Sequence, residues 1–210
     1  MKKFELTTKF ITNVAGKKLF RIKALVEFGN VKAGELGGYV EKEGNISQDG
    51  NATVDGNATV SGNAWVTGNT TVSGNATVTG NTKVSGNATV SGNAWVHGNA
   101  WVTDNTEVSG NATVSGNAEV SGNATVSGNA EVSGNTDYAL AQGFGTEFRC
   151  TTFYRGKNKK IMVNCGCFHG DLEEFRKQVK ETRSGKIAKE YLMIADLMEY
   201  HFASEDSDDE

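Results

Sequence analysis

The chain has 210 residues, a formal net charge of -4, three cysteines and no proline. This charge excludes a nucleic-acid-binding protein that relies on a large excess of Lys and Arg, although both ends of the chain are mildly basic. No apolar run approaches membrane-spanning length, and the polar stretch after Met1 is unlike a signal peptide. We therefore expect neither a membrane nor a nucleic acid as partner. An odd number of cysteines is typical of reduced thiols, so we expect a cytoplasmic protein.

Residues 1–43 are expected to form a small β cap. The stretches 4–11 and 19–28 are rich in β-forming residues, and Gly16-Lys17 between them is typical of a hairpin turn. A body built from stacked strands leaves an open sheet edge at its first strand, and such an edge promotes aggregation unless it is covered. We therefore expect this hairpin to cover the start of the repeats that follow.

Residues 44–139 are dominated by a six-residue repeat. From Gly50 to Ser133 the pattern Gly-Asn-Ala-Thr-Val-Ser recurs in 14 consecutive hexads without insertion or deletion, and a ragged hexad lies on either side. Ala and Val are two positions apart, so both point to one side of a short strand while the residue between them points outward. Gly, and less readily Asn, adopts the left-handed backbone needed at a corner. The repeat therefore predicts a solenoid with a Val and Ala interior and ladders of stacked Asn.

The repeat resembles that of left-handed parallel β-helices, in which an aliphatic residue is followed four positions later by a small one, as in Val54 and Ala58. The resemblance implies three hexads per triangular coil and about 4.7 coils, each rising roughly 4.8 Å. It also implies a left-handed coil, although parallel crossovers are generally right-handed.

The segment 31–41, Val-Lys-Ala-Gly-Glu-Leu-Gly-Gly-Tyr-Val-Glu, leads into the Gly-Asn hexads. Over residues 20–139 this arrangement resembles the YdcK-like bacterial β-helix proteins. Those proteins have been described as transferases because of their fold, and a fold alone supports no particular chemistry.

Most outward positions of the hexads carry Thr, but three carry Trp. With 18 residues in a coil, one column is predicted to contain Trp65, Lys83, Trp101 and Glu119, and Trp95 is predicted to lie on the neighbouring face between Thr77 and Thr113. Trp65 and Trp101 would then be about 10 Å apart, with Lys83 between them in cation–π contact.

Solvent-facing tryptophans on a Thr and Ser surface indicate a contact patch. The alternative is that a terminal segment covers them. We take Trp65, Lys83, Trp95, Trp101 and His97 as the candidate binding or interface residues.

His97 is the only histidine of the repeat. Acyltransferases with this type of repeat commonly combine a histidine near a coil edge with a loop that leaves the coil. Here no loop interrupts the coils, and the residues 18 positions from His97 are Thr79 and Ser115, neither of which is a strong partner for orienting a general base. We therefore expect no catalytic residue.

Residues 140–203 are expected to form a small α+β module, and the acidic residues 204–210 a disordered tail. Two strands over 148–154 and 161–168 precede a helix that starts with the capping box Asp171 and Glu174, and a second helix covers 186–202. This run resembles a ββαα module at the C-terminus of uncharacterised phage and prophage proteins. The resemblance implies a phage context, and so the cytoplasm of a host bacterium, but no chemistry.

Cys165, Cys167 and His169 alternate along the second of these strands, so we expect them to share one face of it, and Cys150 lies on the partner strand. The four side chains could bind zinc. Their spacing is not that of a common zinc finger, and the alternative is that small apolar thiols pack beneath the helices. We expect neither a metal nor another cofactor.

The sequence thus predicts a mainly β protein: a single-stranded left-handed parallel β-helix with an N-terminal β cap and a small C-terminal α+β module. For the function we expect a non-enzymatic phage- or prophage-type protein, a homo-oligomer with a trimer favoured. It would bind or sequester a host protein or a small molecule, with counter-defence as one such role. A hexapeptide-type acyltransferase and a structural spacer are the alternatives.

Overall fold

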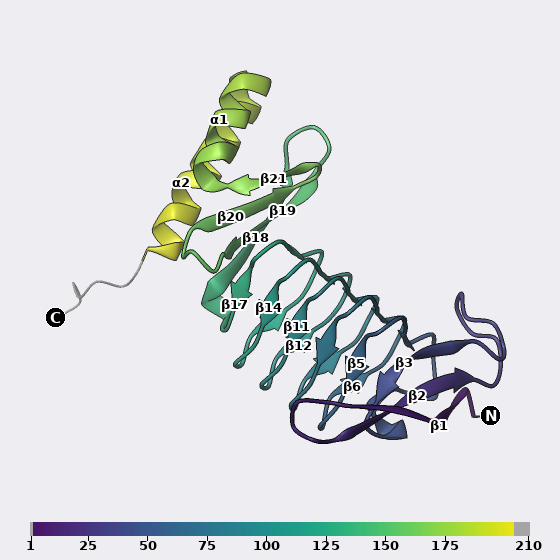
Figure 1. The fold of residues 1–210 in the computed structure, drawn as a ribbon. Helices are drawn as coiled ribbons and strands as arrows, with labels where there is room; N and C mark the ends of the chain where they lie inside the picture. The colour runs from purple at the N-terminus through teal and green to yellow at the C-terminus, as the bar shows by residue number, and fades with distance from the viewer. Residues whose placement is uncertain (1, 204–210) are drawn as a thin grey trace.

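The structure is a computed structural model, and residues 2–203 are described. The tail expected at 204–210 lies outside the described residues. The repeat forms a β-solenoid of about five turns, with a hairpin at one end and a two-helix module at the other (Figure 1). The predicted architecture of cap, solenoid and small α+β module is confirmed. The left-handedness of the coil, which was expected from the resemblance, stays a prediction.

Each coil contributes one two-residue strand to each of three parallel faces. Face 1 contains β4 (Thr53–Val54), β7 (Thr71–Val72), β10 (Thr89–Val90), β13 (Glu107–Val108) and β16 (Thr125–Val126). Face 2 contains β5 (Thr59–Val60), β8 (Thr77–Val78), β11 (Trp95–Val96), β14 (Thr113–Val114) and β17 (Glu131–Val132). Face 3 contains β6 (Trp65–Val66), β9 (Lys83–Val84), β12 (Trp101–Val102) and β15 (Glu119–Val120).

The register of these faces follows the repeat. Thr89 lies opposite Thr71 and Val90 opposite Val72, so residues 18 apart stack on one another as predicted. The inward Val and Ala side chains of the regular hexads are at most 2% exposed and form one continuous core. On the outside, the Asn57 side-chain amide donates to the Asn75 side-chain oxygen at 3.2 Å, and the same bond recurs along the corners. Both the packed interior and the Asn ladders were predicted.

The backbone hydrogen bonds made by the corner Asn and the outward residue of each hexad all point the same way along the solenoid. The backbone N–H groups of Asn57 and Thr59 donate to carbonyls of the next coil toward the C-terminus, at 2.8 and 2.9 Å. The other regular hexads repeat this hydrogen-bonding pattern. The first coil is therefore left with carbonyls that need donors, and the last coil with N–H groups that need acceptors. The two ends of the chain supply these partners.

Donors gather at the N-terminal end. The Lys3 ammonium donates to the Gly50 and Ala52 carbonyls at 3.2 and 3.0 Å, and the Asn45 amide donates to the Gly62 and Ala64 carbonyls at 3.2 and 2.9 Å. Burial lowers the pKa of Lys3 to about 8, with Asp49 acting in the opposite direction. Asn45 ends a short 3₁₀ turn, Glu43–Asn45.

The predicted hairpin is confirmed and extends face 2. Its strands β1 (Phe4–Thr12) and β2 (Lys18–Ala24) pair antiparallel, and β3 (Leu36–Val40) joins β2 to β5. The hairpin thus covers the open edge of this face, and Phe4 packs into the solenoid core.

Acceptors gather at the C-terminal end. The Asp137 carboxylate accepts from the N–H groups of Ser133 and Gly134 at 2.8 and 2.9 Å, and the Thr152 hydroxyl accepts from the N–H of Thr125 at 2.9 Å. Asp137 ends a second 3₁₀ turn, Asn135–Asp137. Each end of the solenoid is therefore closed by groups of the complementary hydrogen-bonding type.

The C-terminal module is an antiparallel sheet covered by two helices. Its strands are β18 (Tyr138–Phe144), β19 (Arg149–Arg155), β20 (Ile161–Cys165) and β21 (Phe168–Asp171), followed by α1 (Leu172–Thr182) and α2 (Gly185–Phe202). Neighbours on β19 point to opposite sides: Tyr154 is buried in the solenoid core, and Phe153 is buried beneath the helices. The sheet thus closes the last coil on one side and carries the helices on the other.

The two helices and the capping box were predicted correctly, but the strands differ. The N–H of Glu174 donates to the Asp171 carboxylate at 3.0 Å, and the N–H of Asp171 donates to the Glu174 carboxylate at 2.8 Å. Strand β18 was not predicted, and it crosses the boundary expected between residues 139 and 140. No further Gly-Asn corner follows this stretch, so it is free to pair antiparallel with β19.

Candidate functional site

Face 3 places an ammonium group between two indole rings. Lys83 lies opposite Trp65 on one side and Trp101 on the other, as predicted. Its Nζ is 5.6 Å from the ring centre of Trp65 and 5.4 Å from that of Trp101. Each contact is worth about 0.5–1 kcal/mol at an exposed site. These contacts favour the stacked arrangement of the three side chains.

Trp95 and His97 extend this column around the edge of the solenoid. Trp95 lies on face 2 between Thr77 and Thr113, as predicted. His97 follows at the corner between faces 2 and 3, with its ring centre 4.1 Å from that of Trp95. Burial lowers the pKa of His97, which favours the neutral ring. The structure thus places the Trp65–Lys83–Trp101 column on face 3, and Trp95 and His97 on the adjoining face 2 and the corner between the two faces. These five residues are called here the aromatic corner (Trp65, Lys83, Trp95, His97 and Trp101).

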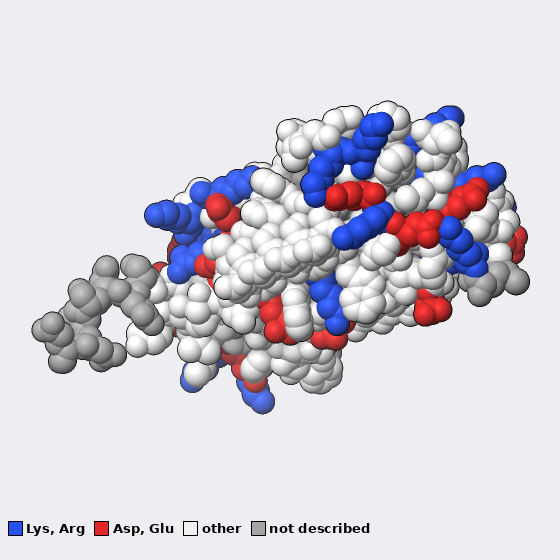
Figure 2. Space-filling model, turned by 90° about the horizontal axis from the view of Figure 1, so that it is seen from below, with Lys and Arg blue, Asp and Glu red and all other residues white. Residues whose placement is uncertain are grey.

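The tryptophans of the aromatic corner face solvent. Trp65 is 45% exposed, and Trp95 and Trp101 are each 47% exposed. The alternative that a terminal segment covers them is therefore wrong for residues 2–203. Figure 2 shows a broad uncharged band along the stacked repeats, with charged side chains gathered mainly toward the two ends. The corner presents apolar ring surface beside indole N–H groups that make no hydrogen bond within the described part of the chain.

His97 lacks the surroundings of a general base. No hydrogen bond to its ring occurs among residues 2–203, and the strands from β4 to β17 recur without an intervening loop. A catalytic base needs an orienting partner and a site that encloses substrate. The geometry offers His97 a stacking role against Trp95 instead, and the expectation of no catalytic residue stays a prediction.

The cysteines and His169 do not share one strand face, so that interpretation was wrong. Gly166 has a φ of 61°, and with Cys167 it forms a tight turn that splits the expected strand into β20 and β21. The turn leaves Cys167 exposed, and the His169 ring lies beside Asn164, with 2.5 Å between Nδ1 and Oδ1. Within residues 2–203, no three Cys, His, Asp or Glu side chains gather closely enough to hold a metal ion.

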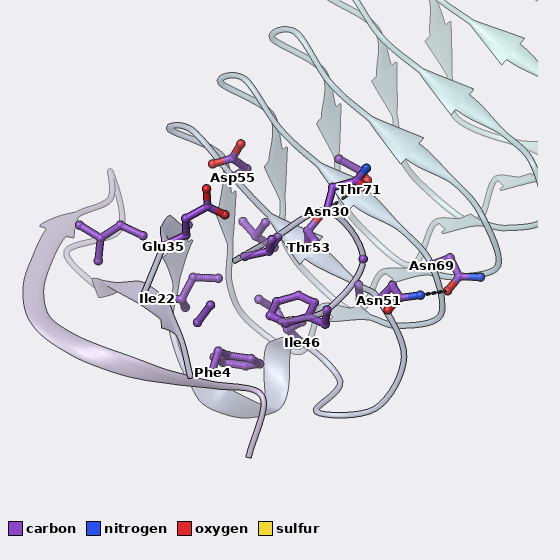
Figure 3. A pocket seen from close by; sticks show the side chains of 18 residues that line it. Phe4, Ile22, Asn30, Glu35, Ile46, Asn51, Thr53, Asp55, Asn69 and Thr71 are labelled. Atoms are coloured by element: carbon purple, nitrogen blue, oxygen red, sulfur yellow. Dashed lines mark hydrogen bonds between the residues drawn. The ribbon is translucent and has the colours of Figure 1, made fainter. Parts of the chain in front are cut away.

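A cavity that the sequence did not indicate lies at the N-terminal end of the solenoid (Figure 3). It has a volume of about 440 Å³ and is formed by the segment before β3 and the first strands of face 1. Glu35 and Asp55 both line it although 20 residues separate them. Strand β3 pairs with β5 at an offset of 20 residues, Tyr39 opposite Thr59, so the 18-residue spacing gave no hint of this neighbourhood.

Part of the repeat matches a known family. Residues 83–98 and 118–134 match the family model of the YdcK beta solenoid repeat. Two segments of the solenoid are therefore similar to the YdcK beta solenoid repeat. The first match contains Lys83, Trp95 and His97, so part of the aromatic corner lies within the recognised repeat.

The comparisons go no further than the repeat. No curated protein matches this chain. The likeness of its C-terminal module to phage proteins stays a prediction. No helix within residues 2–203 is both long and apolar enough to cross a lipid bilayer.

Proposed function

We propose that this protein is a non-enzymatic binding protein that self-associates through its aromatic corner. Three tryptophans, each nearly half exposed and placed on two adjoining faces of the solenoid, are the observation that carries the proposal. Tryptophan is strongly enriched at the energetic centres of interfaces. A surface built on regular stacked strands is already ordered, so it loses little backbone entropy when it associates.

The proposed occupant of the corner is a second copy of the chain. The corner joins two faces, with Trp95 on face 2 and the Trp65–Lys83–Trp101 column on face 3. Each copy can therefore contact one neighbour through each face, and contacts of this head-to-tail kind form a ring when the rotation from copy to copy closes. Glu119 continues the column beyond Trp101, so one column carries both an ammonium and a carboxylate for pairing between copies. We favour a trimer, the arrangement that the resemblance to β-helix proteins implies.

The biological role in this proposal is sequestration. The assembled protein would act in the cytoplasm of a phage-infected bacterium and hold a host protein or a small molecule away from its target, with counter-defence as the outcome. This role rests on the resemblance of the C-terminal module to phage and prophage proteins. Neither the acyltransferase nor the spacer alternative is favoured by a feature of the described residues.

The double change Trp65→Ser and Trp101→Ser tests the self-association. Because each lost Trp anchor costs on the order of 2 kcal/mol or more, the dissociation constant should rise at least roughly a thousandfold for the pair. Light scattering should show oligomer for the unmodified protein at micromolar concentration and monomer for the variant.

The matched control is Thr89→Ser with Glu107→Ser, which alters two stacked outward positions of face 1. This control should keep the oligomeric state, and all three proteins should keep the same β circular dichroism spectrum. A monomer in the unmodified protein, or an oligomer that survives the double Trp change, would contradict the proposal.

A further inference from the structure

The cavity at the N-terminal end is separate from the aromatic corner and has the form of a ligand site. Its volume of about 440 Å³ falls within the range of clefts that enclose small molecules. It lies on face 1, whereas the aromatic corner lies between faces 2 and 3. Whatever occupies one site leaves the other open.

The cavity has an apolar side. Phe4, Ile22 and Ile46 lie together on one side of it, and Ala52 and Val54 of the first coil continue this surface (Figure 3). All five side chains are at most 6% exposed and belong to the solenoid core, so this side is rigid. Such a surface accommodates a flat hydrocarbon or aromatic body.

The opposite side of the cavity is acidic. Glu35 and Asp55 lie near one another there, away from the apolar side chains (Figure 3). The lining contains no Lys, Arg or His, and within residues 2–203 neither carboxylate forms a salt bridge. Among the described residues, the Glu35 carboxylate accepts one hydrogen bond, from the backbone N–H of Lys32 at 2.7 Å, and the Asp55 carboxylate accepts one, from that of Gly56 at 2.6 Å. Each carboxylate can accept further hydrogen bonds from a ligand.

Lys3 does not supply the missing positive charge. Its ammonium donates to the Gly50 and Ala52 carbonyls and lies 4.5 Å from the centre of the Phe28 ring. Asp49 interacts with the same ammonium and raises its pKa, opposing the larger effect of burial. Lys3 is thus engaged outside the lining, and the two carboxylates of the cavity remain without a cation.

We propose that this cavity binds a small organic cation with a flat apolar body, such as an aromatic amine or an aryl amidine. The apolar side takes up the flat body, and Glu35 and Asp55 receive the cationic group. The side chains of Asn30, Asn51 and Thr53 also line the cavity and add polar groups to it. The charge distribution selects against anions of the same shape.

The experiment uses three probes of one shape on the full chain: benzamidine, neutral benzamide and anionic benzoate. Titration calorimetry or saturation-transfer NMR should show that benzamidine binds, benzamide binds more weakly and benzoate does not bind. The combined change Glu35→Gln and Asp55→Asn should weaken the binding of benzamidine by about tenfold or more, so that benzamidine binds no more tightly than benzamide. Glu107→Gln, a carboxylate of face 1 outside the cavity, should have no effect.

A second variant tests the location without changing charge. Outward positions of the repeat already carry Trp at three places, so Thr53→Trp should leave the coil intact while its ring fills the cavity. Thr53→Trp should abolish benzamidine binding, and Thr89→Trp, two coils further along the same face, should not.

Three results would overturn the proposal. The first is no benzamidine binding at about 10 mM, the weakest affinity expected for so small a fragment. The others are equal binding of benzamidine and benzoate, and equal effects of Thr53→Trp and Thr89→Trp on benzamidine binding. None of these results bears on the oligomeric state, so the two proposals fail independently.

Discussion

Val90→Asp should unfold several coils together. Val90 is fully buried in the middle of the solenoid and stacks between Val72 and Val108. A carboxylate there has no partner, so it must either remain charged in an apolar interior or take up a proton at a cost. Because each coil is supported only by its neighbours, the damage spreads along the stack. We expect a loss of at least about 4 kcal/mol in the free energy of unfolding.

The matched control for this change is Thr89→Asp, one residue away and facing outward. The new carboxylate would lie directly opposite Glu107 in the parallel pair, an unfavourable but solvent-exposed contact, so the loss should stay within about 1 kcal/mol. Urea denaturation followed by circular dichroism measures both variants. Similar losses for the two changes would refute the assignment of inward and outward positions.

Gly80→Ala should also destabilise the protein strongly, because a corner glycine meets two constraints. Its φ is 85°, and a Cβ at this position would lie 2.6 Å from the carbonyl oxygen and 2.9 Å from the nitrogen of Gly98. Both atoms belong to the backbone of the next coil, so the stack itself would have to shift. We expect a cost of at least about 3 kcal/mol, of which only about 1 kcal/mol comes from the left-handed backbone.

Gly16→Ala separates these two contributions. Gly16 has a similar φ of 76°, but a Cβ there would have no neighbour within 4 Å. Its loss should therefore be the backbone cost alone, about 1 kcal/mol. If thermal denaturation gave equal losses for Gly16→Ala and Gly80→Ala, the close stacking of corners would be wrong.

The repeat made much of this structure predictable. A strict period of six residues with two inward positions fixes which side chains enter the core. The Trp65–Lys83–Trp101 column followed from that period together with the three hexads per coil that the resemblance to left-handed β-helices implies, and the pairing of β6, β9 and β12 confirms it. The ladder of Asn side chains followed in the same way.

Prediction was less successful where the period ends. The 3₁₀ turn Glu43–Asn45 adds residues between β3 and the first regular coil, so the pairing offset there is 20 instead of 18. With this offset, Glu35 and Asp55 line the same cavity. No pattern in the hexads predicts the offset. In the C-terminal module, a single glycine turn at Gly166 separated side chains that the alternation had placed on one face.

Tryptophan fluorescence tests the central claim most directly, because all three tryptophans of the chain belong to the aromatic corner. If copies associate through this corner, the rings that are nearly half exposed in one chain become buried in the assembly. At concentrations where light scattering shows an oligomer, we predict blue-shifted emission and weak quenching by acrylamide, with both changes reversed on dilution to monomer. An oligomer whose tryptophans are quenched as readily as those of the diluted monomer would show that the copies meet elsewhere and would contradict the account.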